Sequence, residues 1–368
     1  MIKFLHAADL HLDSPLVSAQ DPALRRAALR QTARRIFDLA EREAVDIILL
    51  AGDLFDNASP FADTVELIKM LTRKAGVSVF IAPGNHDCCR AGSAYLDEDW
   101  GENVHIFKKA NLEKVCLGEL GLSVWGSAFV NEEKYGDTLE NFSVDDENIN
   151  IVLLHAELAN SNSKYCPVTL NSIDASGADY VALGHIHKFA SGTTPSGAVW
   201  AQPGCPEGRG FDETGDKGVI IGEIEKGSVK LRFEKICSLR YFDIEVTLDC
   251  GDDPVEKCLE AVKTCGANDI CRITLAGESA GVDHLAIKTA LRDHCALHSL
   301  KDTTRPSKAM FEDALDQSLK GRFLAQMKQA WESAPTEKEK LSAALALRFG
   351  LAALEGRQPP QSGAYYEN

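Results

Sequence analysis

Residues 178–187 read ADYVALGHIH, an apolar run that ends in a glycine and two histidines. The run is rich in Val, Leu and Ala without polar alternation, as expected for a strand that is covered on both faces. If the chain stays extended past this run, His185 and His187 point to the same side and can face one common centre. The pair alone is weak evidence for a metal, since two histidines at a strand end are more often solvated or hydrogen-bonded.

Four further apolar runs end in the same way, in polar residues that can bind a metal. They are IKFLHAAD (2–9), VDIILLAGD (45–53), VSVFIAPGNHD (77–87) and INIVLLHAE (149–157). Helices are expected at residues 21–44, with Asp21 as N-cap and Pro22 in the first turn, and at residues 61–75, before Gly76. The alternation of strands and helices predicts a layered α/β fold with a largely parallel sheet, in which ligands gather at the carboxyl ends of the strands.

The ends of these five runs carry a mixed set of metal-ligand side chains. The candidates, expected at the same edge of one sheet, are Asp9, His11, Asp53, Asn85, His155, His185 and His187. Imidazole nitrogens with carboxylate and amide oxygens suit Mn²⁺, Fe²⁺ or Zn²⁺ better than Ca²⁺. Since no cysteine joins the set, a closed structural zinc site is not expected. Two metals about 3.5–4 Å apart could share Asp53 as a bridge.

The motif order DxH, GD, GNHD, H and GHxH resembles the calcineurin-like metallophosphoesterase superfamily over about the first 235 residues. The resemblance implies two divalent ions, Mn²⁺ foremost, with Fe²⁺, Zn²⁺ or Mg²⁺ as alternatives. It implies that one ion is held by Asp9, His11, Asp53 and His187, and the other by Asp53, Asn85, His155 and His185. His86 would then be the general acid and not a ligand. Asp87 would either orient the His86 imidazole or stabilise the turn.

Shorter phrases narrow the expected substrate. HAADLHLDSPL (6–16), GDLFDNASP (52–60) and PGCPEGRGFDETGDKG (203–218) resemble bacterial DNA repair exonucleases of the SbcD type, particularly the subgroup named YhaO. This resemblance implies a DNA exonuclease or phosphodiesterase in which a hydroxide held by two metals attacks phosphorus. It also implies a homodimer and a partner ATPase with coiled coils, of the SbcC/YhaN type. Arg209 is a candidate for binding a phosphate, with an ordinary loop arginine as the alternative.

The chain is expected to begin with a metallophosphoesterase domain at 1–236, which the hairpin at 218–236 closes. A small α/β capping domain with a βαβαβ pattern is expected at 237–305, and Asp253 with Pro254 marks its first helix start. A helical partner-binding region at 306–356 and a disordered tail at 357–368 complete the chain. The apolar residues that recur every four positions in the helical region are Phe311, Leu315, Leu319, Phe323, Met327 and Trp331. A capping box runs from Thr336 to Glu339.

Composition limits the function classes. The net charge is −16, with 23 basic and 35 acidic residues before residue 237, which counts against a simple nucleic-acid binder. Metal ions would supply local positive charge. The eleven cysteines form no CxxC pair, so most are expected to be small buried hydrophobes. The sequence has no apolar run of membrane-spanning length and no secretory pattern at its start, which predicts a cytoplasmic protein without a membrane anchor.

Two alternatives remain open. The same chemistry could act on a nucleotide, a cyclic nucleotide or a phosphoprotein. A scaffold could use the same fold without catalysis, although every expected ligand is present here. The arginines of the first helix leave a further choice, between a solvated face and a track for DNA phosphates, with the solvated face favoured. They are Arg25, Arg26, Arg30, Arg34 and Arg35.

Overall fold

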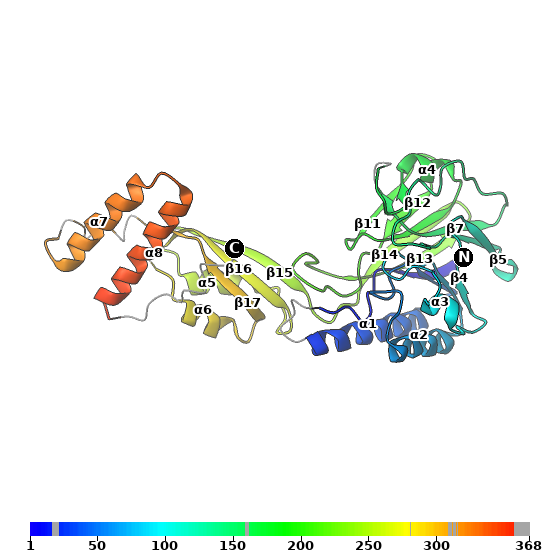
Figure 1. Cartoon of the computed structure of the whole chain (residues 1–368), viewed down its shortest axis with the longest axis horizontal. Helices are drawn as coiled ribbons and strands as arrows, with labels where there is room; N and C mark the ends of the chain where they lie inside the picture. The colour runs from blue at the N-terminus through cyan, green and yellow to red at the C-terminus, as the bar shows by residue number, and fades with distance from the viewer. Residues whose placement is uncertain are drawn as a thin grey trace. The chain divides into compact units, whose positions relative to one another are not determined.

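The structure is a computed structural model. It describes residues 1–16, 22–158, 162–279, 281–307, 311, 314 and 316–356. The chain divides into two compact units, Met1–Ser238 and Leu239–Asn368 (Figure 1). The expected N-cap Asp21, the apolar residue Leu315 and the expected disordered tail at 357–368 lie outside the described residues.

The first unit contains two six-stranded sheets. One has the spatial order β14-β13-β1-β2-β3-β4 and the other the order β11-β12-β10-β7-β6-β5. The first sheet consists of β1 (Ile2–Ala7), β2 (Ile47–Leu50), β3 (Ser78–Ile81), β4 (Val104–Ile106), β13 (Gly218–Glu225) and β14 (Ser228–Lys235). The second consists of β5 (Glu113–Leu117), β6 (Leu122–Gly126), β7 (Ile149–His155), β10 (Tyr180–Gly184), β11 (Ala190–Thr193) and β12 (Val199–Gln202). A separate pair is formed by β8 (Glu157–Leu158) and β9 (Pro167–Val168).

The expectation of one sheet is therefore wrong. The apolar runs at 2–9, 45–53 and 77–87 form β1, β2 and β3, which are parallel. The runs at 149–157 and 178–187 form β7 and β10 of the second sheet. Phe4 and Leu49 of the first sheet pack in one core with Ile151 of the second, so these two sheets lie face to face. A continuous apolar run shows that both faces of a strand are covered, but it does not reveal whether a helix or another sheet covers them.

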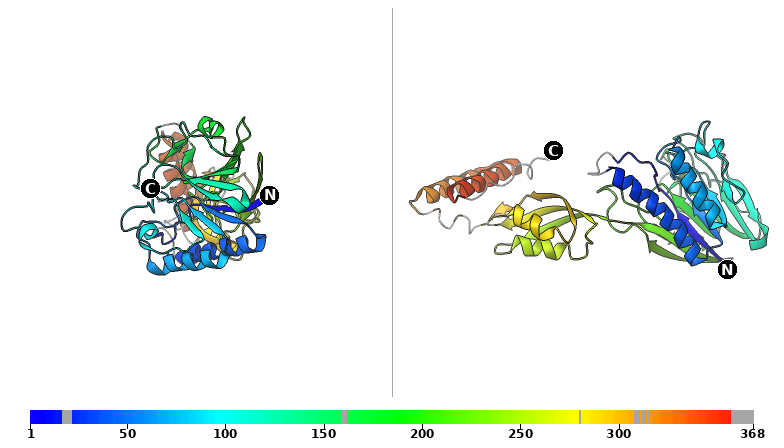
Figure 2. Two further views of the ribbon diagram at one scale, coloured as in Figure 1. Left: turned by 90° about the vertical axis from the view of Figure 1, so that its right-hand side faces the viewer. Right: turned by 90° about the horizontal axis from the view of Figure 1, so that it is seen from below.

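Helices cover the outer face of the first sheet. α1 (Pro22–Glu43) and α2 (Ala62–Ala75) cover this face (Figure 2), and Ile36 and Ile68 pack there with Ile48. Both helices match their expected ranges, and α2 ends at Gly76 in a left-handed conformation, with φ 68°. The shorter helical segments of this unit are α3 (Ala94–Asp97), the 3₁₀ turn Gly118–Leu120 and α4 (Leu170–Ala175).

The arginines of α1 are held by protein groups. Arg25 is buried and its guanidinium donates to the Gly208 carbonyl oxygen at 2.5 Å, while Arg30 forms an ion pair with Asp63 at 2.6 Å. Arg35 donates to the carbonyl oxygen of Ile236 at 3.3 Å. These contacts fit neither a simple solvated face nor a continuous track for phosphates, because the three guanidinium groups are engaged in fixing α1 to its neighbours.

The second unit is built from a parallel βαβαβ segment followed by two helices. Its elements are β15 (Tyr241–Leu248), α5 (Pro254–Ala261), β16 (Ile270–Ser279), α6 (His284–Leu291), β17 (Ala296–Asp302), β18 (Arg305–Pro306), α7 (Leu319–Ser333) and α8 (Glu337–Leu354). The first helix starts as expected, with Pro254 in its first turn and the Asp253 carboxylate accepting from the Val255 N–H at 2.8 Å. In the described part of the chain, no helix combines the length and hydropathy needed to cross a bilayer.

The helical region begins later than expected. Residues Arg305–Pro306 form β18 and pair with β16, and α7 starts only at Leu319. The Ser318 side chain accepts from the Gly321 N–H at 3.0 Å and caps the helix there. Of the apolar residues expected every four positions, Leu319, Phe323, Met327 and Trp331 lie on α7. The Thr336 to Glu339 capping box is present at the start of α8.

A buried ion pair fixes α8 within the second unit. Arg348 of α8 is 6% exposed and donates to Asp302, at the end of β17, at 2.6 Å and to the Thr304 carbonyl oxygen at 3.0 Å. Replacing Arg348 by methionine leaves the Asp302 carboxylate buried without this partner, which should cost about 3–5 kcal/mol. Hydrogen exchange of the full chain should show the α8 amides roughly 10²–10⁴-fold less protected. The exposed Arg322→Met, on α7, is the matched control and should change protection little; equal protection in both variants would contradict the prediction.

Candidate metal centre

All seven expected ligand residues come together at the carboxyl ends of strands from both sheets. The two sheets are tied at this edge, because the backbone N–H of His185, after β10, donates to the Asp9 carboxylate, after β1, at 3.0 Å. The Asp9 N–H in turn donates to the Gly52 carbonyl oxygen, after β2, at 3.0 Å. The edge that holds the ligands therefore belongs to two sheets.

Four of the seven have left-handed backbones. The φ angles are 55° at Asp9, 43° at His11, 47° at Asp53 and 86° at His185. Residues other than glycine adopt such angles at a cost of order 1–3 kcal/mol, and such strain clusters at functional sites. The argument that an extended chain carries His185 and His187 to one side is therefore wrong. The chain turns at His185, and the two imidazoles reach different neighbours.

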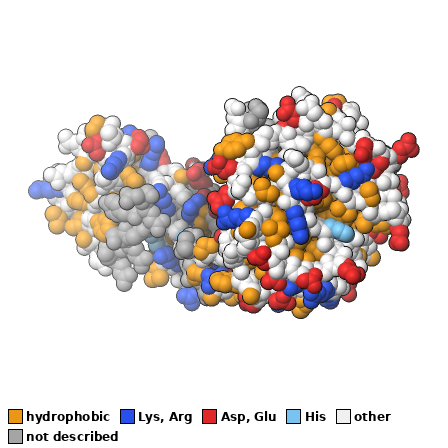
Figure 3. All heavy atoms as spheres, turned by 45° about the vertical axis from the view of Figure 1, so that its right-hand side comes forward, with side chains coloured by type: hydrophobic (Ala, Val, Ile, Leu, Met, Phe, Trp, Pro, Cys, Tyr) orange, Lys and Arg blue, Asp and Glu red, His pale blue; other side chains and the backbone are white. Residues whose placement is uncertain are grey.

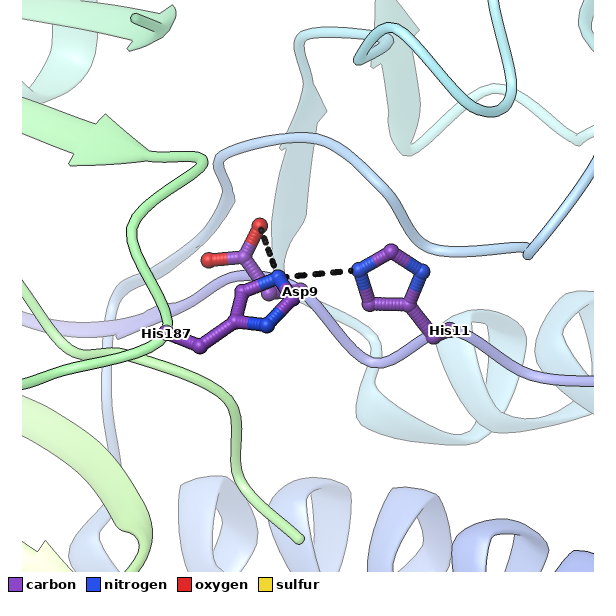
Figure 4. A group of neighbouring side chains, drawn as sticks. All are labelled: Asp9, His11 and His187. Carbon is purple, nitrogen blue, oxygen red and sulfur yellow. Dashed lines mark hydrogen bonds and ion pairs between the residues drawn. The ribbon is translucent and has the colours of Figure 1, made fainter. Parts of the chain in front are cut away.

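The first group of ligand atoms surrounds His11 and His187. Their Nε2 atoms lie 3.1 Å apart, and Nε2 of His187 lies 3.9 Å from Oδ1 of Asp9 (Figure 4). Nε2 of His11 also lies 3.6 Å from Oδ2 of Asp53. The other ring nitrogen of each imidazole, Nδ1, contacts a carboxylate. Nδ1 of His11 lies 2.9 Å from Oδ1 of Asp56, and Nδ1 of His187 lies 2.7 Å from Oε1 of Glu213.

These contacts fit a cation between the two rings. An imidazole that donates from Nδ1 to a carboxylate carries, when neutral, a lone pair on Nε2. Two such lone pairs 3.1 Å apart repel each other, and the Asp9 carboxylate adds further negative charge. Oδ2 of Asp9 is buried and has no hydrogen-bond partner among the described residues. A divalent ion would satisfy this oxygen and both nitrogens.

The second group surrounds His155. Its Nδ1 donates to the Ala51 carbonyl oxygen at 2.9 Å, which leaves Nε2 as an acceptor in the neutral ring. That Nε2 lies 3.0 Å from Oδ1 of Asn85, 3.4 Å from Oδ2 of Asp53 and 3.3 Å from Nδ1 of His185. Burial lowers the pKa of His155, but the negative charge of Asp53 outweighs it and raises the pKa to about 9. The negative charge of Asp53 thus favours a positive charge at His155, and the same charge would favour a metal ion there.

Two glycines allow these groups to approach the backbone. A Cβ at Gly52 would lie 2.4 Å from Nδ1 of His155, and one at Gly84 would lie 2.2 Å from Oδ1 of Asp53. Gly52 also has a φ of 86°, which favours glycine over other residues. Any side chain at these positions would push the candidate ligands out of place.

His86 lies at the rim of the centre. Its side chain is 46% exposed, and its ring centroid lies 4.8 Å from that of His11. Its backbone N–H donates to Oδ1 of Asp53 at 2.9 Å, and its Nδ1 lies 3.3 Å from the Asp56 carbonyl oxygen. One ring nitrogen of His86 also lies within 4.8 Å of ligand atoms of His11 and Asp53. His86 is therefore beside the ligands and accessible from solvent.

Asp87 faces the turn. Its carboxylate accepts from the backbone N–H groups of Gly84 at 2.8 Å and Phe55 at 3.1 Å, and from the Tyr95 hydroxyl at 2.5 Å. Of the two roles expected for Asp87, these contacts correspond to the stabilisation of the turn.

Arg209 is engaged by two carboxylates. Its guanidinium lies 2.8 Å from Oε1 of Glu213 and 3.3 Å from Oδ1 of Asp56, and it is also 3.2 Å from Nδ1 of His187. Glu213 and Asp56 were not expected from the sequence to take part in the site. Asp56 lies in the phrase GDLFDNASP and Glu213 in PGCPEGRGFDETGDKG, but neither phrase assigned them a role, and only their proximity to His11 and His187 identifies that role.

Comparison with known proteins identifies relatives of this chain. Residues 2–189 match the family model described as calcineurin-like phosphoesterase. The chain is 35% identical over 248 residues to "Uncharacterized metallophosphoesterase YhaO" of Bacillus subtilis, covering 64% of this chain and 60% of that protein. It is 26% identical over 278 residues to "DNA double-strand break repair protein Mre11" of Saccharolobus solfataricus, covering 70% and 71%. It is 25% identical over 220 residues to the SbcCD nuclease subunit of Staphylococcus epidermidis, covering 50% and 57%. The matched region is thus less than two thirds of YhaO and of the SbcCD nuclease subunit.

Proposed function

The chain belongs to the calcineurin-like phosphoesterase family, and from this premise we propose that it is a divalent-metal-dependent phosphodiesterase that cleaves DNA, acting as an exonuclease in repair. The observation that carries the proposal is the convergence of acceptor atoms in two adjoining groups, with Asp53 in contact with both. A metallophosphoesterase needs such a donor set, and the names of two relatives, a break repair protein and a nuclease subunit, support DNA as the substrate.

The proposed metal ligands follow from the two groups. Asp9, His11, Asp53 and His187 would hold one ion, and Asp53, Asn85, His155 and His185 the other. When bound, two divalent ions withdraw negative charge from the phosphate oxygens and lower the pKa of a water molecule. We expect Mn²⁺ at both positions, because mixed imidazole and carboxylate ligands suit it.

His86 is proposed to hold the proton that the leaving oxygen receives. The contact of Nδ1 with the Asp56 carbonyl oxygen orients the ring and leaves Nε2 for the substrate. The exposed position of the side chain allows a phosphodiester to approach it. Imidazole is the side-chain group that most readily takes up and gives up a proton near neutral pH, as a general acid must.

Basic and aromatic groups beside the centre support a polynucleotide substrate. The Tyr165 ring centroid lies 4.7 Å from that of His185, and Nζ of Lys164 lies 5.4 Å from the Tyr165 ring. In Figure 3, several Lys and Arg side chains lie on the forward face of the first unit, and many acidic side chains lie toward its outline. Ammonium groups and aromatic rings are the groups that bind phosphates and stack on bases.

Assembly with other chains is part of the proposal. The SbcCD nuclease subunit is by its name one component of a complex, which supports an SbcC/YhaN-like coiled-coil ATPase as the partner of this chain. We place its binding on the α7 and α8 helices. A homodimer through α2 is supported by two exposed apolar side chains, Phe61 at 63% and Met70 at 52%. The proposed site of action is the cytoplasm, on DNA ends.

The substrate assignment is tested by comparing linear duplex DNA, single-stranded DNA and a small aryl phosphodiester in Mn²⁺. DNA should be cleaved with a kcat/KM about 10–10²-fold higher than that of the small ester, because one stacked base alone contributes about 1–3 kcal/mol. EDTA should abolish all three reactions, and added Mn²⁺ should restore them. Cleavage of the small ester without cleavage of DNA would discard the nuclease assignment and favour a nucleotide, cyclic nucleotide or phosphoprotein substrate.

A further inference from the structure

The loop between β12 and β13, residues 203–217, reaches the candidate metal centre through one carboxylate. Glu213 is 4% exposed, although it carries a charge. Its Oε1 lies 2.7 Å from Nδ1 of His187, and its Oε2 accepts from the backbone N–H of Arg209 at 2.7 Å. A carboxylate buried in this way is fixed on both oxygens, so it holds the His187 ring in one orientation.

Asp56 holds the opposite ring in the same way. Its Oδ1 lies 2.9 Å from Nδ1 of His11, just as Oε1 of Glu213 lies 2.7 Å from Nδ1 of His187. The Arg209 guanidinium connects the two carboxylates, at 2.8 Å from Glu213 and 3.3 Å from Asp56. One cation therefore ties together the two anions that support the facing imidazoles of His11 and His187. We call Asp56, Arg209 and Glu213 the clamp.

The other candidate metal position is supported differently. His155 donates from Nδ1 to a backbone carbonyl, that of Ala51, and its orientation does not depend on the clamp. The two positions thus differ in what fixes their imidazoles. A change in the clamp should act on one position and spare the other.

We propose that Asp56, Arg209 and Glu213 are positioning residues that set the affinity of the metal position formed by His11 and His187. The proposal rests on the proposed function, since it concerns the metals of that site. The carboxylates select the ring tautomer with a lone pair on Nε2 and hold both Nε2 atoms toward the centre. Groups that support a ligand in this way typically contribute about 10–100-fold to metal affinity. Arg209 then acts by keeping the carboxylates in place and not by binding a phosphate.

A second glutamate of the same loop provides a matched control. Glu207 is 1% exposed. Its carboxylate accepts from the Thr32 hydroxyl at 2.7 Å and from the backbone N–H and hydroxyl of Ser238 at 2.7 and 2.6 Å. It is as buried as Glu213 and as extensively bonded, but its bonds fix α1 and the end of the first unit. Loss of its charge should disturb the loop without acting on His187 directly.

The test is a Mn²⁺ titration of the full chain by calorimetry, with electron paramagnetic resonance as a second readout. The wild-type chain should bind two ions. Glu213→Gln should bind one ion with unchanged affinity and the other about 10–100-fold more weakly. Glu207→Gln should bind both ions as the wild type does, even if its melting temperature falls. Arg209→Gln should show the same selective loss as Glu213→Gln, and it provides the test if Glu213→Gln does not fold.

The outcomes separate this proposal from the proposed function. If the wild-type chain binds no Mn²⁺, the metal centre itself is absent and the proposed function is lost. If the wild-type chain binds two ions and both clamp variants do so with the same affinities, the centre stands and the positioning role is overturned. An equal weakening in Glu207→Gln would also overturn it, because the loop would then act only through its general stability.

Discussion

A chain with His86 replaced by alanine should bind two Mn²⁺ ions as the wild type does and cleave DNA about 10²–10⁴-fold more slowly, the usual contribution of a general acid. The physical reason is the location of the ring. It is 46% exposed at the rim, next to His11, and its backbone N–H donates to Asp53, so removal of the side chain leaves that contact in place. The measurements are kcat at saturating Mn²⁺ and a Mn²⁺ titration of the same preparation.

The leaving group provides a sharper test of the proton. In an aryl phosphodiester of a strongly acidic phenol, the phenolate can leave without being protonated. The variant should therefore lose much less activity on this ester than on DNA. His105→Ala is the control, because His105 lies on β4 and stacks on Phe80 with ring centroids 5.1 Å apart. A His86→Ala chain with full activity on DNA would refute the general acid, and one that loses a Mn²⁺ ion would make His86 a ligand.

Local patterns predicted the elements of the fold well. The apolar runs before Asp9 and Asp53 became parallel neighbours, β1 and β2, and the Asp253 and Thr336 caps begin helices where expected. The pairing of strands into sheets was beyond these patterns. β1 lies against the antiparallel strand β13, which is over 200 residues away in the sequence, while β7 joins another sheet. The pairing of distant strands depends on the side chains of both strands, and a single apolar run describes only one strand of the pair.

The ligand residues were easier to predict than the residues that orient them. Asp9, His155 and their companions occur at the ends of apolar runs, in motifs with fixed spacing. Glu213 and Asp56 have no such spacing, because each acts on a histidine that folding alone brings near. Backbone geometry was also missed. The left-handed φ at His185 replaces the extended conformation that the HxH spacing suggested.

The largest effect is expected from Asp53, because it lies between the two candidate metal positions. Its Oδ2 is 3.6 Å from Nε2 of His11 and 3.4 Å from Nε2 of His155. In Asp53→Asn the shape is kept, but one negative charge is removed and a neutral amide faces both positions. Both Mn²⁺ ions should bind more weakly, and kcat/KM should fall by at least about 10³-fold, since the ions supply several kcal/mol of charge stabilisation. A Mn²⁺ titration and rates across Mn²⁺ concentrations measure both effects.

Asp179→Asn is the matched control for Asp53→Asn. Asp179 is also a buried carboxylate of the first unit, but it precedes β10 and accepts from the backbone N–H groups of Asn150 at 2.8 Å and Gly227 at 2.9 Å. It lies at the end of β10 opposite to His185, so its loss should lower stability and leave Mn²⁺ binding intact. Glu213→Gln gives a second contrast. It should weaken the binding of one Mn²⁺ ion, whereas Asp53→Asn should weaken the binding of both. If Asp53→Asn weakened the binding of only one Mn²⁺ ion, Asp53 would be a ligand of a single metal. If the binding of both ions were unchanged, Asp53 would not be a metal ligand.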